Sequence, residues 1–395
     1  MTNQGINSAE VYELLLRRSL TMPSRQLYLH VRDLLHVLHA EPENSLLVTL
    51  ALLITGLILG RNVQFWELAV WMPADIQLLS AVRRFERFVA NPDVKVAVLF
   101  EPFVLAMQAS LSSETAYLIL DCTQVGRQCR TLMAALAYHE TVLPLGWQSI
   151  RGKKGHVTGA FQTALLARLQ PYLRAYRHVV VPSDAEYCNE PVITWVRQQQ
   201  WDFVCHVRTR QLMHTPADPT WQPIAELVDT SDLRAGQVRH CEQVCFTQEH
   251  RLTGLTLTIQ WGPGEAEPLC LISNLPAAHQ PHLVYERRFW IETLFGSCKS
   301  RAFGLARTHL TDPEHIDRLI LAIAIATCMT LGLGTQLVLT KQTAQGDRAN
   351  RRDLGLFQIG WRWLHRLLAL DRLPEFKMVF SWRFTLAKPG FRPAT

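Results

Sequence analysis

Hydrophobic and polar positions change their period three times along the 395 residues of the chain. Residues 1–110 carry apolar positions at helical spacing, as in "IQLLSAVRRFERFVANP", and predict a helical region. Beyond residue 110, short apolar runs such as "TAYLILD" (115–121) and "HVVVPSD" (178–184) alternate with helical stretches. Strands that alternate with helices predict an α/β core with some parallel pairing.

The pattern changes again near residue 205. The runs "RHCEQVCFT", "RLTGLTLTIQW" and "LCLIS" read as strands separated by turns, and they predict a β-rich insertion into the α/β core. Helical patterns then return and continue almost to the end of the chain. We therefore expect five segments: a helical DNA-binding or dimerisation domain at 1–110, the first part of the core at 111–204, the β-rich insertion at 205–280, the second part of the core at 281–340, and a helical basic C-terminal region rich in aromatic residues at 341–395.

Two long apolar runs raise the question of a membrane. The run at 46–59 has fourteen residues and is too short to cross a bilayer. The run at 319–339 is long enough, but it contains threonines, a glutamine and two glycines, and it follows the polar stretch "TDPEHIDR". We expect both to form buried core helices, with a membrane protein as the less favoured alternative.

Positive charge is concentrated at the C-terminal end. From Lys341 onward there are eleven Lys and Arg against four Asp and Glu, a net charge of +7, so the rest of the chain carries −1 of the overall +6. Basic residues interleaved with aromatic ones favour nucleic acid, although "LFQIGWRWLHRLLAL" is also typical of an ordinary amphipathic helix. Nine cysteines without a secretory signal indicate reduced thiols and hence the cytoplasm.

Two of the predicted strands end on an acid, at Asp121 and Asp184. If these strands are parallel neighbours, both carboxylates emerge at the edge where open α/β sheets bind ligands. Taken singly, Asp121 is equally explained as a turn residue and Asp184 as a helix N-cap. Asp202 is a weaker competitor for the second acid, because it begins a predicted strand.

The stretch "YERRFWIETLFGSCK" at 285–299 supplies a third carboxylate. At about 100° per residue, Tyr285, Arg288, Glu292 and Lys299 share one narrow helical face. An ordinary ion pair explains only Arg288 and Glu292. A carboxylate for a metal beside donors for phosphate explains all four. Three converging carboxylates would repel one another, and two Mg²⁺ ions would offset that repulsion while serving phosphoryl transfer.

The spacing Y-x2-R-x3-E-x6-K, downstream of "DCTQV" and "VVVPSD", resembles the DDE transposases of bacterial insertion sequences, in particular the family with that Tyr-Arg-Glu-Lys signature. The similarity extends to "LPLGW", "LISNLP" and "DLGLFQIGWRWL". It implies an RNase H-like fold with Asp121, Asp184 and Glu292 as the metal-binding catalytic triad. It also implies a set of residues that hold DNA phosphates near the cleaved end: Tyr285, Arg288 and Lys299.

Further DNA contacts are expected around the triad. Arg208 and Arg210 close the strand after Asp184 and reach either DNA or solvent. Trp261 lies in the β-rich segment, where relatives carry an aromatic residue that stacks on a flipped base; a core tryptophan is the equal alternative. Trp221 competes for that role, but it lies farther upstream in a proline-flanked loop.

The resemblance implies cut-and-paste transposition with a hairpin on the transposon end as an intermediate. The expected cofactor is Mg²⁺, as two ions, with Mn²⁺ as a substitute. The expected partners are double-stranded DNA, namely terminal inverted repeats and target DNA, and a second copy of the chain in a homodimer. Two alternatives stay open: an RNase H-like nuclease that does not transpose, and a domesticated DNA-binding protein that has lost catalysis.

Overall fold

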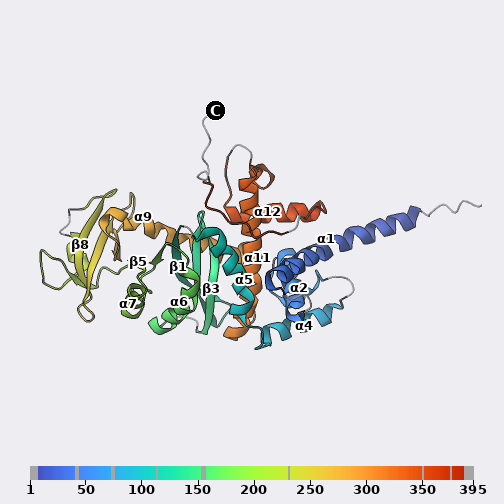
Figure 1. The fold of residues 1–395 in the computed structure, drawn as a ribbon, viewed down its shortest axis with the longest axis horizontal. Coiled ribbons are helices and arrows are strands. Elements are labelled where there is room, and N and C mark those ends of the chain that lie inside the picture. The colour runs from blue at the N-terminus through green and yellow to red at the C-terminus, as the bar shows by residue number, and fades with distance from the viewer. Residues whose placement is uncertain are drawn as a thin grey trace, which may run out of the picture. The chain divides into compact units, whose positions relative to one another are not determined.

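The computed structural model describes most of the chain, and residues 387–395 of the basic C-terminal region lie outside the described part. The described residues are 8–40, 44–72, 76–112, 114–152, 157–229, 232–348, 351–373 and 376–386. The chain forms two compact units (Figure 1). A helical unit comprises 1–110, 125–129 and 296–395, and a sheet unit comprises 111–124 and 130–295. The five expected segments stay a prediction, since the units follow a different division.

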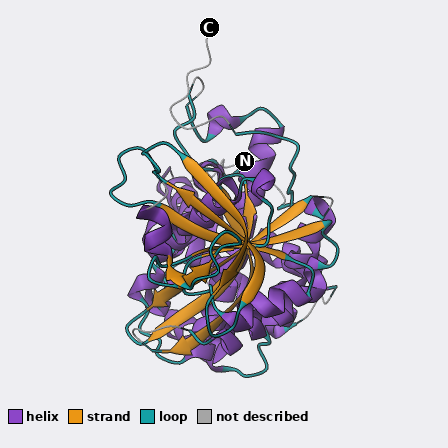
Figure 2. Ribbon diagram, turned by 90° about the vertical axis from the view of Figure 1, so that its left-hand side faces the viewer, coloured by secondary structure: helices purple, strands orange, loops and turns teal. Residues whose placement is uncertain are grey.

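The sheet unit is built on one twisted ten-stranded sheet, which Figure 2 shows nearly end-on. Its strand order is β3-β2-β1-β4-β5-β10-β9-β8-β6-β7. In chain order the strands are β1 (Thr115–Val125), β2 (Cys129–Tyr138), β3 (Thr141–Arg151), β4 (His178–Ser183), β5 (Asp202–His206), β6 (Leu212–His214), β7 (Gln222–Pro223), β8 (Val238–Phe246), β9 (Leu252–Gln260) and β10 (Leu269–Ser273).

The sheet is mixed, and its parallel part lies in the middle. β1 pairs with β4 and β4 with β5 in parallel, whereas the pairs from β5 through β10, β9 and β8 to β6 and β7 are antiparallel. The predicted α/β class and the parallel pairing of the two acid-bearing strands are therefore confirmed. Strands of the 205–280 segment continue the same sheet through the pairing of β10 with β5, instead of forming a sheet of their own.

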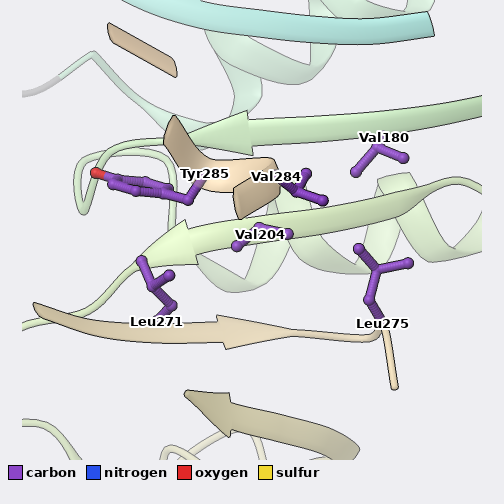
Figure 3. Packing of buried hydrophobic residues seen from close by; sticks show 6 residues of the cluster. All are labelled: Val180, Val204, Leu271, Leu275, Val284 and Tyr285. Atoms are coloured by element: carbon purple, nitrogen blue, oxygen red, sulfur yellow. The ribbon is translucent and has the colours of Figure 1, made fainter. Parts of the chain in front are cut away.

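Helices cover this sheet, and two of them contain candidate residues. They are α6 (Gly159–Leu173), α7 (Glu190–Gln198), α8 (Ile224–Asp229), α9 (Pro281–Tyr285) and α10 (Ile291–Gly296), with a 3₁₀ turn at Ala277–His279. The segment α9 contacts β4, β5, β10 and β9. There Tyr285 and Val284 pack with Val180, Val204 and Leu271 of three neighbouring strands (Figure 3). This apolar contact fixes the segment that follows α9 on the same face of the sheet.

The helical unit contains the N-terminal and C-terminal helices. These are α1 (Ser8–His39), α2 (Ser45–Gly60), α3 (Phe65–Ala69), α4 (Leu78–Ala90), α5 (Val96–Leu111), α11 (Pro313–Leu339) and α12 (Leu356–Ala369), with 3₁₀ turns at Leu305–Arg307 and Thr343–Gln345. The expected helices at 46–59 and 319–339 are both present and buried. Among the described residues, α11 alone is long and apolar enough to cross a membrane, and 94% of its apolar window is buried within the protein.

Glycines bring α11 and α12 unusually close. A Cβ at Gly360 of α12 would overlap the Thr330 carbonyl oxygen, and one at Gly334 of α11 would overlap the Leu356 carbonyl oxygen. The close crossing explains why "TLGLGTQ" is glycine-rich inside a helix, where glycine otherwise costs stability. It also buries Trp361, which stacks on Phe357. The aromatic residues of α12 thus belong partly to the core, as in an ordinary amphipathic helix.

Candidate active site

Asp121 and Asp184 lie side by side on neighbouring parallel strands: Asp184 directly follows β4, whereas Asp121 lies within β1, which continues to Val125 instead of ending at the acid as expected. Leu120 of β1 is in register with Ser183 of β4, so the next residue on each chain is the acid. Asp121 Oδ1 accepts a hydrogen bond from its neighbouring backbone N–H at 2.8 Å, and Asp184 Oδ1 accepts the equivalent one at 2.7 Å. Each carboxylate therefore has one oxygen held by the backbone, while its Oδ2 is directed to a shared partner.

The segment that carries Glu292 departs from the expected regular helix. It runs from α9 through a 3₁₀ turn at Glu286–Trp290 into α10, and then into a π-helical turn at Ser297–Arg301. A 3₁₀ turn has three residues per turn, so the angles of a regular α-helix do not carry across it. The prediction of one continuous α-helical face for Tyr285 through Lys299 is wrong for this reason. Tyr285 is 3% exposed and lies in the apolar cluster, and Lys299 belongs to the helical unit.

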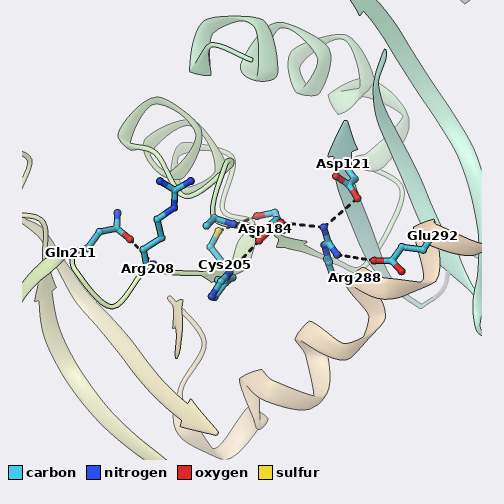
Figure 4. Close-up of polar contacts among 10 residues, drawn as sticks. Asp121, Asp184, Cys205, Arg208, Gln211, Arg288 and Glu292 are labelled. Atoms are coloured by element: carbon cyan, nitrogen blue, oxygen red, sulfur yellow. Dashed lines mark hydrogen bonds and ion pairs between the residues drawn. The ribbon is translucent and has the colours of Figure 1, made fainter. Parts of the chain in front are cut away.

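Arg288 is the shared partner of all three acids (Figure 4). Its Nη2 donates to Asp121 Oδ2 at 3.3 Å and to Asp184 Oδ2 at 3.2 Å. Its Nη1 donates to Glu292 Oε1 at 3.1 Å, which is the i,i+4 pair expected from the spacing. The Arg288 side chain is only 11% exposed. One guanidinium thus supplies the positive charge that allows three carboxylates to converge.

The two aspartates differ in their electrostatics. Burial raises the pKa of Asp121, and the nearby Arg288 only partly opposes this. A hydrogen bond from His206 lowers the pKa of Asp184 to about 2, with the backbone N–H and Arg288 acting in the same direction against burial. Burial alone would lower the pKa of Arg288, but Asp121 and Asp184 raise it. The guanidinium is therefore firmly charged, as three acid partners require.

His206 is a site residue that sequence reasoning missed. Ser183 of β4 is in register with Cys205 of β5, which places His206 beside Asp184. The His206 Nδ1 lies 3.2 Å from Asp184 Oδ1. The run "DFVCHVRTR" was recognised as a strand, but only the β4–β5 register connects its histidine to the acid. That register is a long-range property, and no local spacing signals it.

Asp202, the competing acid, lies elsewhere on the sheet. It is opposite Val180 at the start of β5, roughly 13 Å along the strand direction from Asp184. Its carboxylate pairs with His178 Nε2 at 2.6 Å. Asp202 therefore lies near the opposite ends of the parallel strands from Asp121. The geometry favours Asp184 as the second acid.

The other expected DNA contacts have different surroundings. Arg208 and Arg210 are exposed, and with Gln211 they line a cavity of about 370 Å³ that Ala185 also borders. Trp261 follows β9 and is half-buried, and its indole Nε1–H donates to the Glu265 carbonyl oxygen at 2.9 Å.

Trp221 is also half-buried, and its ring stands edge-on to His214 with the two ring centroids 4.7 Å apart. It therefore packs against a neighbouring side chain of its own segment, as a structural tryptophan does.

The donor chemistry of the three acids suits a hard cation. All the converging ligand atoms are carboxylate oxygens, which Mg²⁺ prefers. Among the described residues, no group of three or more His, Cys, Asp or Glu side chains is placed so that it could hold a metal ion. Each of the three acids is paired with Arg288 instead. The three acids fit a divalent cation in residue type, and to bind one they would have to leave Arg288.

The comparison with protein families agrees with this geometry. A family model described as a transposase DDE domain matches residues 113–329, which is more than half of the chain. The chain belongs to this transposase family. The matched range includes Asp121, Asp184 and Glu292. A comparison with curated proteins found no match.

Membership identifies the chain as a transposase that acts on DNA, from a family that uses divalent metal ions. The resemblance found in the sequence is confirmed to this extent, while the narrower Tyr-Arg-Glu-Lys family stays a prediction. In this transposase, Asp184 follows the carboxyl end of β4, where open α/β sheets bind ligands, and Asp121 lies beside it within β1.

Proposed function

We propose that this transposase moves an insertion sequence by a cut-and-paste mechanism at Asp121, Asp184 and Glu292. The observation that carries the proposal is the convergence of the three carboxylates on one guanidinium, beside neighbouring parallel strands. These acids come from sequence positions far apart. Bringing like charges together is costly unless a cation compensates them, and Arg288 provides that charge here.

The cofactor in this proposal is a pair of Mg²⁺ ions, with Mn²⁺ as a substitute, which Asp121, Asp184 and Glu292 would hold. Two such ions stabilise the attacking and leaving oxygens of an in-line phosphoryl displacement. With the acids engaged in this way, the guanidinium of Arg288 would be available to a DNA phosphate. Burial, together with the neighbouring Asp184, raises the pKa of Tyr285. Its hydroxyl therefore stays protonated and remains a hydrogen-bond donor.

The reaction is a series of displacements at phosphorus. Water attacks the phosphodiester at the transposon end, the P–O3′ bond breaks, and a 3′-OH and a 5′-phosphate result. The 3′-OH then attacks the opposite strand, closing a hairpin and releasing the flanking DNA. Hydrolysis reopens the hairpin, and the same 3′-OH attacks target DNA, with a target 3′-OH as the leaving group. Each step breaks one P–O bond for each one formed.

The partners follow from this chemistry. The substrates are double-stranded terminal inverted repeats and target DNA. Two transposon ends are cut and joined together, which suits a homodimer that holds one end in each copy. The proposed location is the cytoplasm, in association with the nucleoid, where the DNA lies.

Trp261 is the proposed platform for a flipped base. β9 runs in the same direction as β4, because it is antiparallel to β10 and β10 is antiparallel to β5. Trp261 thus follows β9 at the same edge as the acids, roughly 15–20 Å from Asp184 across three strand spacings. Hairpin closure requires a base to leave the stack, at a cost of a few kcal/mol, and an aromatic ring recovers about 1–3 kcal/mol.

Trp261→Ala tests this platform on two substrates, an intact end and an end with an abasic site beside the cut. We expect normal nicking on both, at least about a tenfold loss of hairpin on the intact end, and partial rescue by the missing base. Trp221→Ala is the matched control. Equal loss of nicking and hairpin formation with a lowered melting temperature would make Trp261 a core residue instead.

The proposed function itself is tested with duplexes that contain the element's own ends, in Mg²⁺ and in EDTA. A transposase yields nicked ends, hairpins and products joined to a target plasmid. A nuclease that does not transpose yields hydrolysis alone, and a domesticated protein binds without cleaving. Products without joining, at enzyme concentrations that saturate the ends, would contradict the proposal.

A further inference from the structure

The helical unit contains a basic cavity that the catalytic chemistry does not use. It has a volume of about 560 Å³ and lies among α1, α2 and α4, which pack together (Figure 1). Its polar lining residues come from the three helices and from the residue after α4: Tyr28, Arg32, His36, Ser45, Thr49, Arg84, Arg87 and Asn91.

The charge of this cavity is of one sign. Three arginines and a histidine line it, and no Asp or Glu is among the described residues that do so. Within the described part of the chain, Arg84 has no hydrogen bond or ion pair. The Arg87 Nε donates only to the Arg83 carbonyl oxygen at 3.2 Å, which leaves its charge uncompensated. Arg32 alone pairs with an acid, Asp33, at 2.8 Å.

The helices direct these groups to the same space. Tyr28, Arg32 and His36 follow one another at i,i+4 spacing along α1, and Arg84 and Arg87 are neighbours on one face of α4. The first turn of α2 also lines the cavity and contains no acid, so the partial positive charge of that helix end adds to the field. The His36 Nε2 is buried and has no hydrogen-bond partner among the described residues. These features are independent of one another and all favour an anion.

We infer that this cavity binds a phosphate group of the DNA backbone and so holds DNA on the helical unit. The inference rests on the proposed function, because DNA is the anion that a transposase meets. Exposed guanidinium groups suit phosphate, since each presents a planar pair of donors to its oxygens. Such contacts position DNA without reading its sequence. The helical N-terminal region is thereby assigned to DNA rather than to dimerisation.

The test is the salt dependence of DNA binding by the full-length chain. Binding of a fluorescent duplex is measured over a range of KCl concentrations for the parent, Arg84→Ala, Arg87→Ala and Arg83→Ala. Arg83 is the matched control, because it is an exposed arginine of the same helix that does not line the cavity. We expect the slope of log K against log salt to fall by about one unit for Arg84→Ala and for Arg87→Ala, and to stay unchanged for Arg83→Ala.

Melting temperatures equal to that of the parent establish that the variants are folded. Slopes for Arg84→Ala and Arg87→Ala that match Arg83→Ala would overturn the inference. A changed elution volume in size-exclusion chromatography without a changed slope would also overturn it, by assigning the cavity to a contact between copies.

Cleavage is measured on the same duplex with the parent and Asp121→Asn, and this separates the two proposals. Loss of slope in a chain that never cleaves would leave the cavity assigned and the proposed function contradicted. Cleavage by the parent, combined with normal DNA binding by the cavity variants, would leave the proposed function supported and the cavity inference contradicted.

Discussion

Arginines have opposite surroundings in the two units of this transposase. In the sheet unit, Arg288 is 11% exposed and contacts three carboxylates within 3.3 Å. In the helical unit, Arg84 and Arg87 are exposed and face a cavity without an acid among its described lining residues. The same side chain therefore balances internal charge in one place and leaves its charge free in the other.

The difference shows which arginine charges are compensated within the protein and which face solvent. A guanidinium that is surrounded by carboxylates contributes little attraction to an external phosphate, because its charge is already compensated. Under the proposed function, Arg288 would be available to a phosphate only if a metal engaged its acids, whereas the charges of Arg84 and Arg87 face a cavity without an acid among its described lining residues. The order of events would be DNA capture on the helical unit, then assembly of the catalytic centre.

The largest expected effect comes from neutralising an acid around Arg288. Asp121→Asn and Glu292→Gln should each reduce cleavage more than about 100-fold, since even partners behind a metal ligand contribute 10–100-fold. DNA binding and its salt slope should persist, because the exposed arginines are untouched. Gel assays of cleavage and fluorescence assays of binding on one duplex check both. Retained cleavage in Glu292→Gln would remove this residue from the centre.

Removing the buried arginine should give the next largest effect, on stability. Arg288→Gln leaves three acids without a cation, and in EDTA we expect a loss of about 2 kcal/mol, or about 4–8 °C in Tm. The loss is smaller than for a fully buried pair because Asp184 and Glu292 are partly exposed. Mg²⁺ should restore more Tm to this variant than to the parent.

Arg84→Gln is the control for that measurement, and its Tm should stay within about 2 °C of the parent, as for other surface changes. Equal melting temperatures for the Arg288 and Arg84 variants in EDTA would remove the distinction between the two arginine environments.

A third arginine, Arg61, has an aromatic partner and gives the smallest expected effect. It lies 5.7 Å from the ring centre of Trp361. Burial, together with the charge of Arg61, lowers the pKa of His365 to about 4. Because only the unfolded chain takes up this proton between pH 6.5 and 4, stability should fall as the pH is lowered through that range. Urea unfolding at several pH values should show a flatter profile for His365→Gln.

A profile for His365→Gln as steep as that of the parent would place the acid sensitivity in other groups. The charge of Arg61 would then have no measurable effect on its neighbour. The comparison of arginine environments would then rest on Arg288, which contacts acids, and on Arg84 and Arg87, which face the cavity.

The sequence was informative wherever a local pattern has one structural meaning. Asp121 and Asp184 could be chosen because each ends an apolar run, and the parallel pairing of their strands is confirmed. The buried helix at 319–339 was likewise evident from its polar interruptions and glycines. The strands β4, β8, β9 and β10 follow the predicted runs closely, whereas β1 continues to Val125, past the predicted end at Asp121.

Other features depend on contacts that no local pattern encodes. The 3₁₀ and π turns around α10 change which residues share a face, so Tyr285 moved from the expected polar stripe into the core. His206 reaches Asp184 only through the register of β4 and β5. Arg288 was recognised with one acid partner, yet its other two partners lie 104 and 167 positions away. Long-range register, rather than residue type, limited the prediction.

The most direct measurement of the central claim compares Asp184→Asn with Asp202→Asn in the same Mg²⁺-dependent cleavage reaction. Both residues are aspartates of neighbouring parallel strands, and both contact a histidine. Only Asp184 meets Asp121 and Glu292 through Arg288. The account predicts that Asp184→Asn abolishes cleavage while Asp202→Asn cleaves like the parent. Cleavage by Asp184→Asn with loss in Asp202→Asn would contradict it.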